Sequence, residues 1–481
     1  MRWLAIIVAV AALADLAVGW ASCSDAPRAA DVAVLAERAA PLDLAAPYAA
    51  GDYQFLDAAI GSASIVQLGE SLHITDELPR VRARFVRYLH EQLGFDTIAL
   101  EGSLVQAWLA EDQLARTGDV STAQTIAWFP LWHTPAMREL MDYIASTRAT
   151  AHPLYLTSFD AEIGASAAYE GDEGVVTALF AALRGYAPPP ATANLADVQR
   201  GLAVIVRCGG DYDDLADHRG EALAAVAVLD TWVRAAVPHV APAPHATVLA
   251  RIPTNFLAMV DLCTRAEGMG EMWQELRDEL NAASVIDLRD HVSTAHKIIT
   301  WAHHSHVAYD STRENVPSMG QHLRDRVGAA VYTIGTFAGG GRVITGELFG
   351  ERDLPSARKF GIERMLGAVD RDAYFVDVSR LPATDPHAGW RTEQTSRLET
   401  FYRRPTVLSS DFDGAIFVAR VHPAYFTEGR ASRALLWLWG FVLEHAVGVT
   451  LALVAGVVLG VRAIVRRLVR RIRAWRGTRA A

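Results

Sequence analysis

Short apolar runs recur along the chain, separated by segments in which apolar residues return every three or four positions. Such runs are typical of buried strands, and the periodic segments are typical of amphipathic helices. The segment 81–93 carries Phe85, Leu89 and Leu93 four residues apart and stops at Gly94, which predicts a helix between two strands. The predicted strands are residues 65–68, 97–100, 154–159, 297–301, 329–337, 373–378 and 414–418.

A strand, a helix and a second strand in succession indicate a βαβ unit, with parallel strands and a right-handed crossover. The predicted fold class is therefore α/β, a central and mostly parallel sheet flanked by helices. Residues 51–164 and 289–425 are expected to supply this core in two parts, with 108–141 helical. Between them, the alanine- and leucine-rich residues 165–288 predict a helical insertion that covers the ligand-binding edge of the sheet.

Both ends of the chain are apolar. Residues 1–22 resemble a signal peptide or an uncleaved N-terminal anchor, and 23–50 read as a linker and a first helix. Residues 435–461 contain only Glu444 and His445 as ionisable groups, and a membrane span needs ~20 apolar residues. A buried core helix is the alternative.

The segment 462–481 holds eight arginines and no acid. This arginine block favours the membrane span over a core helix, and it predicts a cytoplasmic tail. The catalytic core would then lie at the cell membrane, outside the cytoplasm. The formal charge of the whole chain is −10, so the remainder carries −18. Because phosphate contacts need clustered cations, we expect no nucleic-acid partner for the acidic body.

Three cysteines are present, and none forms a CxxC pair, which argues against a zinc ribbon or a thioredoxin-type site. Cys208 and Cys263 could form a disulfide if the core lies in an oxidising compartment. Two unpaired thiols are an equally good interpretation of the sequence.

The stretch 65–84 carries the first candidate chemistry. An apolar strand ends at Gly69, and Glu70, His73 and Glu77 follow at spacings that share one face of a helix. A helix that opens directly after the strand would direct these side chains into the crevice at the strand's carboxyl end. A solvated helix with acidic residues near its start is the alternative interpretation.

Other predicted strands also end in ionisable residues. Glu101 and Asp160 close two strands, and His303 and His306 follow a third. His133, between two prolines, is a candidate for the mouth of the pocket. An imidazole with carboxylates within reach is the minimal set for taking a proton from water.

At these residues the chain resembles the erythromycin esterase family. Resemblance to the family's GExxHG-type motif appears at Gly69-Glu70-Ser71-Leu72-His73, followed by Glu77, Arg82 and Arg87. The remaining matches, in chain order, are Ala99-Leu100-Glu101, Phe159-Asp160, Trp301-Ala302-His303-His304-Ser305-His306, Met319-Gly320 and Tyr332-Thr333-Ile334-Gly335. The resemblance spans roughly residues 50–418. Three positions depart from the family pattern: Leu72, Ile74 in place of glycine, and His304 in place of asparagine.

The resemblance implies a hydrolase that cleaves a small-molecule carboxylic ester or lactone with water and needs no cofactor. In that interpretation His73 is the general base, oriented by Glu70 and Glu101. The same comparison assigns Arg82, His303 and His306 to stabilising the oxyanion or positioning the base. Residues expected to bind substrate are Glu77, Asp160, His133 and His304.

Three alternatives remain open at the level of sequence. A divalent metal could be held by the five residues Glu70, His73, Glu101, His303 and His306. Ser71 could be a nucleophile, although its surroundings read Gly-x-Ser-x-His rather than the Gly-x-Ser-x-Gly elbow. The departures at Leu72, Ile74 and His304 would also suit a membrane-tethered binding protein that has lost catalysis.

Overall fold

The computed structural model describes residues 26–127, 132–163, 172–208, 212–266, 271–310, 316–344, 351–355, 357, 361–398 and 402–424. Two compact units are distinguished: Met1–Val343 with Asp353–Thr427, and Ile344–Arg352 with Glu428–Ala481. The second unit lies almost wholly outside the described residues. Predictions for 1–22, 435–461 and 462–481 also lie outside them.

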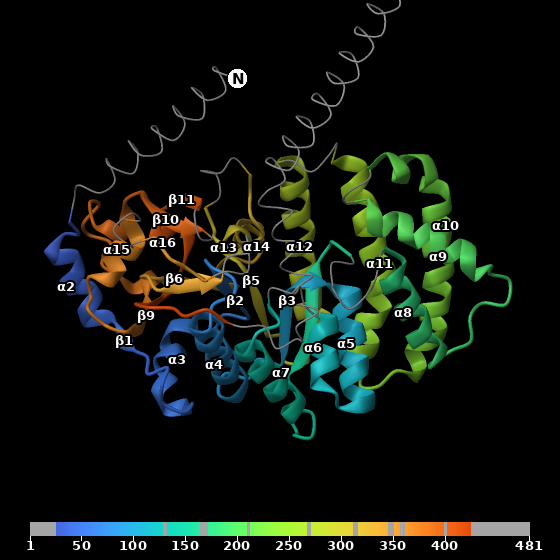
Figure 1. Cartoon of the computed structure of the whole chain (residues 1–481), viewed down its shortest axis with the longest axis horizontal. Coiled ribbons are helices and arrows are strands. Elements are labelled where there is room, and N and C mark those ends of the chain that lie inside the picture. Colours follow the sequence, from blue (N-terminus) through green and yellow to red (C-terminus); the bar gives the residue numbers. More distant parts are fainter. Residues whose placement is uncertain are drawn as a thin grey trace, which may run out of the picture. The chain divides into compact units, whose positions relative to one another are not determined.

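An eight-stranded sheet forms the centre of the first unit, in the order β1-β9-β12-β6-β2-β5-β3-β4 (Figure 1). The six strands from β12 to β4 are parallel to their neighbours, and β9 runs antiparallel to β12 and β1. The strands are β1 Ala40–Pro41, β2 Ile65–Glu70, β3 Thr97–Ser103, β4 Tyr155–Asp160, β5 Ile298–His303, β6 Val331–Ala338, β9 Ala373–Asp377 and β12 Gly414–Val418.

Every predicted strand is present, with ends shifted by at most three residues, so the mostly parallel sheet is confirmed. The first predicted βαβ unit differs in one respect, because β5 lies between β2 and β3 in the sheet. Glu70 and Glu101 are still at the same edge, since all three strands run parallel.

Two hydrophobic cores cover the two faces of the sheet. Successive residues of β2 alternate between them: Ile65 belongs to one core, and Val66 and Leu68 belong to the other. Both faces of a parallel sheet need a cover, which explains why its strands are nearly continuous apolar runs.

Helices supply both covers. One face is covered by α3 Phe55–Ile60, α4 Glu77–Glu91, α6 Val120–Ala127 and α7 Pro135–Thr147. The other face is covered by α2 Ala29–Arg38, α8 Asp172–Arg184, α9 Leu195–Arg207, α10 Tyr212–Ala236, α11 Ala243–Arg265, α12 Glu271–His291, α14 Met319–Val327 and α15 Gly361–Gly367. The helix α5 Leu104–Thr117 contributes residues to both cores. The predicted helical segment 108–141 is divided among α5, α6 and α7.

The predicted helical insertion corresponds to helices α8 to α12, and α8 to α11 gather beyond β3 in Figure 1. Its last helix, α12, packs on β4 and β5, which carry two of the predicted site residues. Cys208, at the end of α9, forms a disulfide with Cys263 in α11, which decides between the two interpretations of these cysteines.

The smaller elements connect these layers. They are η1 Ala50–Tyr53, η3 Val237–His239, α13 His304–Val307, η5 Gly328–Ala330, β7 Arg342–Ile344, β8 Glu351–Asp353, η7 Val378–Arg380, η8 Gly389–Arg391, β10 Gln394–Leu398, β11 Tyr402–Thr406 and α16 Leu408–Asp411. Strands β10 and β11 form an antiparallel hairpin.

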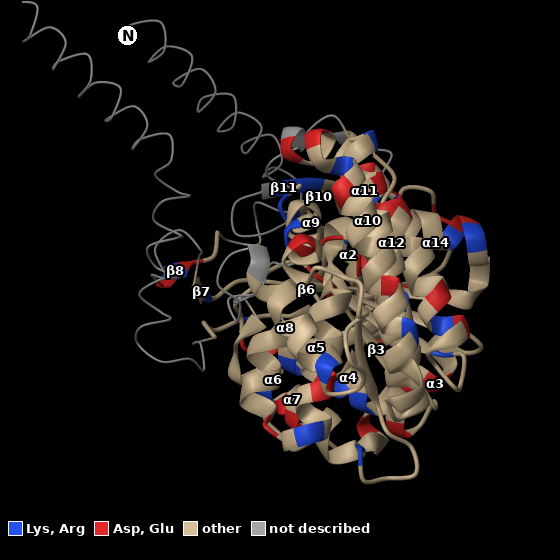
Figure 2. Cartoon of the chain, turned by 90° about the vertical axis from the view of Figure 1, so that its right-hand side faces the viewer, with Lys and Arg blue, Asp and Glu red and all other residues tan. Residues whose placement is uncertain are grey.

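Among the described residues, one helix is long and apolar enough to cross a membrane by composition, namely α11. Half of its most apolar window is buried inside the protein, as expected of a core helix. Acidic and basic positions are interspersed along the helices in the view of Figure 2. The absence of a nucleic-acid partner stays a prediction.

Candidate active site

Three adjacent strands bring the predicted acid and imidazole groups to one edge of the sheet. Glu70, the last residue of β2, is paired in register with His303, the last residue of β5. Glu101 lies near the end of β3, the next strand. The carboxyl ends of neighbouring parallel strands form the ligand-binding edge of open α/β sheets.

Glu70 is the centre of the first cluster. Its side chain is 1% exposed and contacts the guanidinium of Arg82. The second carboxylate oxygen, Oε1, accepts from the Nε1–H of Trp132 at 2.9 Å and from Nδ1 of His73 at 2.5 Å. Burial opposes ionisation of Glu70, but the charges of Arg82 and His73 outweigh it and lower the pKa to about 2.

The ionised Glu70 fixes the tautomer of His73. A carboxylate only accepts hydrogen bonds, so Nδ1 of His73 carries the hydrogen and Nε2 is the ring's proton acceptor. The His73 side chain is 21% exposed, whereas Glu70 is buried beneath it. An imidazole oriented by a carboxylate that is shielded from solvent is the arrangement that a general base requires.

The segment after Glu70 is a turn and not the predicted helix. Helix α4 begins only at Glu77, and Ile74 has a φ of 52°, in the left-handed region that favours glycine. A helix starting at Glu70 is thereby excluded, because a left-handed residue cannot continue a right-handed helix. The turn brings His73 back over Glu70.

The second cluster is centred on His306. Its Nε2 lies 3.1 Å from Oε1 of Glu101, and its Nδ1 lies 2.6 Å from Oδ1 of Asp278 in α12. Both acceptors are carboxylates, so both ring nitrogens donate and the ring is an imidazolium. Burial opposes this charge, but Asp278 and Glu101 outweigh it and raise the pKa of His306 well above its usual range.

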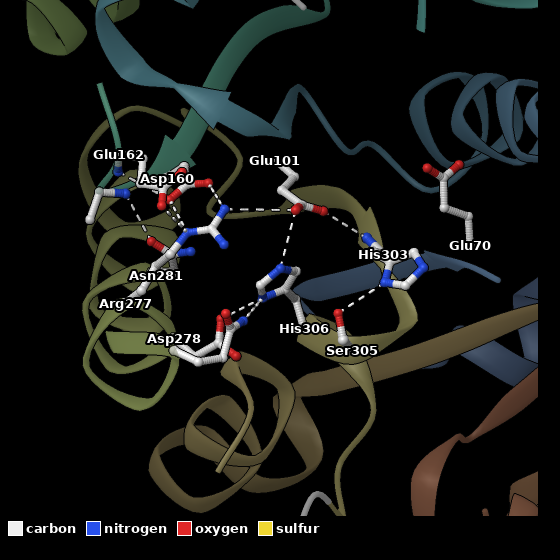
Figure 3. A network of polar contacts seen from close by, with 12 residues as sticks. Glu70, Glu101, Asp160, Glu162, Arg277, Asp278, Asn281, His303, Ser305 and His306 are labelled. Carbon is white, nitrogen blue, oxygen red and sulfur yellow. Dashed lines mark hydrogen bonds and ion pairs between the residues drawn. The ribbon is translucent and has the colours of Figure 1, made fainter. Parts of the chain in front are cut away.

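Glu101 connects the second cluster to the backbone of β5 (Figure 3). Its other oxygen accepts the backbone N–H of His303 at 2.8 Å. Burial opposes ionisation of Glu101, but His306, Arg277 and this N–H lower its pKa well below the ordinary value. Glu101 thus fixes the segment 303–306, and its role in orienting His73 stays a prediction.

His303 faces His73 across the site. The two ring centroids are 5.1 Å apart, and Nδ1 of His303 lies 2.9 Å from Oγ of Ser305. His303 is thus placed beside His73, on which Glu70 also acts through its hydrogen bond.

A third group lies on the insertion side. Arg277 of α12 makes a two-pronged contact with Asp160, at 2.9 Å for Nε to Oδ1. Nε of Arg277 also lies 3.7 Å from Oε1 of Glu162. Burial raises the pKa of Glu162, with Arg277 opposing and the negative charge of Asp160 reinforcing the shift.

Several predicted roles are corrected by burial. Arg82 has no exposed side-chain surface and stacks on Trp301 at 3.9 Å, so it cannot touch an oxyanion. Its contact with Glu70 fits the other predicted role, positioning of the base. Asp160 and His133 are each 1% exposed, so neither is available to bind substrate or to form a pocket mouth.

Two further predicted ligands are also placed elsewhere. His304 is packed between Phe337 and Phe412, and its Nε2 accepts the backbone N–H of Thr336 at 2.9 Å. Both carboxylate oxygens of Glu77 accept hydrogen bonds from His422. Neither His304 nor Glu77 is part of the cluster around His73.

Asp278, Arg277, Trp132 and Ser305 were missed by sequence reasoning. Asp278 and Arg277 are adjacent positions on an insertion helix, where charged residues are expected to face solvent. The one usable signal was Ser305, which lies inside the His-His-Ser-His element.

Among the residues that the structure describes, no group of three or more His, Cys, Asp or Glu side chains is placed to hold a metal ion. The five proposed ligands are divided between the Glu70 and His306 clusters, where cations and N–H groups already contact the carboxylates. Ser71 is fully buried and donates its hydroxyl to the carbonyl of Thr336 at 2.7 Å, so it does not serve as a nucleophile.

Comparison with known proteins gives an independent finding. The family model described as erythromycin esterase matches residues 90–421, more than half of the chain. The match includes Glu101, His303 and His306 and begins after Glu70 and His73. YbfO of Bacillus subtilis strain 168, which its name describes as a hydrolase, is 23% identical over 400 residues, covering 78% of this chain and 87% of YbfO.

Solved structures share the fold. A Bacillus cereus protein superposes with a TM-score of 0.65 at 17% identity, covering 83% of this chain and 98% of its own. A succinoglycan biosynthesis protein gives 0.63 at 16% identity, covering 82% and 98%. A variant of the erythromycin esterase EreC in its open conformation gives 0.55 at 17% identity, covering 79% and 96%.

Proposed function

Because this chain belongs to the erythromycin esterase family, and is a hydrolase by that membership, we propose that it cleaves a carboxylic ester or lactone with water and His73 as general base. The observation that carries the proposal is the hydrogen bond from Nδ1 of His73 to Glu70 at 2.5 Å. Glu70 is kept ionised by the buried Arg82.

In the proposed reaction, His73 takes up and returns one proton, so no other reactant than water and the ester is needed. Nε2 of His73 takes a proton from water as the water oxygen bonds to the acyl carbon. The carbon–oxygen bond of the ester then breaks, and the imidazolium of His73 returns the proton to the leaving alkoxide. A positioned base of this kind typically contributes ~10²–10⁴-fold in rate.

His303 is the group that we assign to the developing oxyanion, because its ring lies beside that of His73. His306 does not exchange protons in this scheme, since it is an imidazolium fixed between Asp278 and Glu101. Its charge and the Glu101 contact hold the backbone of His303 in place. A preorganised donor at an oxyanion typically contributes ~10²–10³-fold in rate.

Loss of catalysis is not favoured by the departures from the family pattern. Leu72, Ile74 and His304 are each at most 4% exposed, so they alter the packing beneath the site and leave the reacting groups intact. A binding protein without turnover therefore has no specific support.

We propose that the protein is exported and held at the cell membrane by residues 435–461, with the arginine-rich tail in the cytoplasm. The Cys208–Cys263 disulfide supports export, because disulfides persist in oxidising compartments. Protease treatment of intact cells tests this: removal of the body with retention of a tail fragment is expected, and full protection contradicts it.

The test of catalysis is a panel of esters and lactones hydrolysed by the full-length protein and by His73→Ala, each with and without EDTA. Loss of turnover in His73→Ala, with retained thermal unfolding, is expected. His218→Ala is the matched control, since His218 is an exposed histidine paired with Asp214 on α10. Unchanged turnover in His73→Ala refutes the base assignment, and loss of turnover with EDTA points to the metal-dependent alternative.

A further inference from the structure

The segment that follows β12, residues 419–424, crosses the end of β6 and reaches the turn that carries His73. We call it the strap. Its Val421 donates its N–H to the carbonyl of Gly340 at 2.9 Å, and the carbonyl of Val421 accepts the N–H of Arg342 at 3.0 Å. The strap is therefore fixed to the loop after β6 before it reaches the site.

The glycines after β6 make this crossing possible. A Cβ at Gly341 would lie 2.0 Å from the carbonyl oxygen of Val421, and one at Gly339 would lie 2.7 Å from the carbonyl oxygen of Ala419. Gly341 also has a φ of 128°, which a side chain rarely tolerates. Gly339 and Gly341 are therefore required for this close backbone approach.

The far end of the strap pairs with the His73 turn as a short antiparallel bridge. Asp76 donates its N–H to the carbonyl of His422 at 3.0 Å, and Ala424 donates its N–H to the carbonyl of Ile74 at 3.2 Å. The bridge is centred on Thr75 and Pro423. The residues on either side of Pro423 make the hydrogen bonds, so the missing N–H of the proline removes no hydrogen bond from the bridge.

Glu77 closes the bridge with its side chain. One oxygen accepts the backbone N–H of His422 at 2.7 Å, and the other lies 2.6 Å from Nδ1 of His422. The contact lies at the surface, since the His422 side chain is 63% exposed. Glu77 is the first residue of α4, so this contact joins the strap to the start of the helix that also carries Arg82.

The turn itself is strained and needs such support. A non-glycine residue in the left-handed region is strained and persists only where the surroundings hold it. Ile74 has this conformation, immediately after His73, and its carbonyl is one of the groups that the strap engages. Release of the strap would let the turn relax and move His73 relative to Glu70.

We propose that the strap is a positioning element for the candidate base, with Glu77 and His422 as positioning residues. The proposal rests on the function assigned above, because it states what holds His73 in place for that reaction. It gives Glu77 a role that requires no contact with substrate.

The experiment compares His422→Ala, His422→Asn and Glu77→Gln in the full-length protein. Asparagine places an N–H donor near the position of Nδ1, whereas alanine removes it. His291→Ala is the control, because His291 is 61% exposed and paired with Asp287 on α12. The readouts are kcat and KM for the best ester of the panel and hydrogen exchange of the peptide 71–77.

His422→Ala and Glu77→Gln are expected to lower kcat by about 10–100-fold with little change in KM, as for a reacting group displaced by up to ~1 Å. Exchange of 71–77 should rise in both, and His422→Asn should restore most of kcat. Unchanged kcat in His422→Ala overturns the proposal, whether or not exchange rises. A wild type that hydrolyses no ester overturns the assigned function instead. Hydrogen exchange of 71–77 then tests the strap alone: a rise in His422→Ala supports its ordering of the turn, and no change overturns it.

Discussion

Replacement of Glu70 by glutamine tests the core of the proposed site. The substitution keeps the shape of the side chain and removes the charge that faces Arg82 and His73. Arg82 has no exposed side-chain surface, so it would be left as a buried cation without its carboxylate. Breaking a buried ion pair by removing one partner typically costs 3–5 kcal/mol.

The pKa of Glu70 gives a second estimate of the same interaction. A shift from 4.5 to about 2 corresponds to about 3 kcal/mol, at 1.36 kcal/mol for each pKa unit. Because the folded-state pKa is depressed, this stability is present above pH 4.5 and is lost as the pH falls toward 2. Both estimates describe one contact and are not to be added.

Turnover should fall along with stability, since a glutamine amide no longer enforces one tautomer of His73. We expect kcat to drop by ~10²–10⁴-fold, the range of a positioned general base. The assays are urea unfolding at pH 7 and hydrolysis of the best substrate of the ester panel. Glu91→Gln is the control, because Glu91 forms a partly exposed ion pair with Arg87 on α4. Such a pair contributes at most ~1 kcal/mol to stability.

A double variant separates stability from chemistry. Glu70→Gln with Arg82→Met removes both charges, and replacing a buried pair by neutral groups is often neutral for stability. Stability should return toward the wild type while turnover stays low. Recovery of turnover in the double variant, or turnover within about threefold of the wild type in Glu70→Gln, would show that Glu70 does not orient the base.

Asp278→Asn should lower kcat by about 10-fold and move the alkaline limb of the pH–rate profile to lower pH. The reason is that His306 loses a charge-assisted contact, worth about 1.5–3 kcal/mol, that raises its pKa. An unmoved profile contradicts this prediction. Cys208→Ser should lower the free energy of unfolding by about 4 kcal/mol in the loop-entropy estimate, and dithiothreitol should bring the wild type to the same urea midpoint. Gly69→Ala should cost about 1–3 kcal/mol, since its Cβ would lie 2.6 Å from a side-chain atom of α13. Thermal unfolding measures it against Gly220→Ala, where the Cβ meets nothing within 4 Å.

The parallel sheet follows from the sequence, because a strand buried on both faces must be a nearly continuous apolar run. Such runs predicted β2, β5 and β6 to within a few residues. Parallel direction also brings all their carboxyl ends to one edge, so the proximity of Glu70 to His303 was accessible from the sequence.

The burial of individual polar groups was not accessible from the sequence. Arg82 and Asp160 look like site residues in a linear motif, yet each is almost fully buried and pairs with another charge. A motif records which residue types occur together, and it does not show which of them a substrate can reach.

The sequence by itself determined the fold class, the shared edge and the closeness of His73 to Glu70, because these depend on local periodicity and on short spacings. Only the tertiary structure decided that Asp278 holds His306 as an imidazolium and that residues 419–424 brace the turn carrying His73. Those contacts join positions 28 and more than 340 residues apart. No local pattern encodes such pairs, since they form only when separate elements pack together.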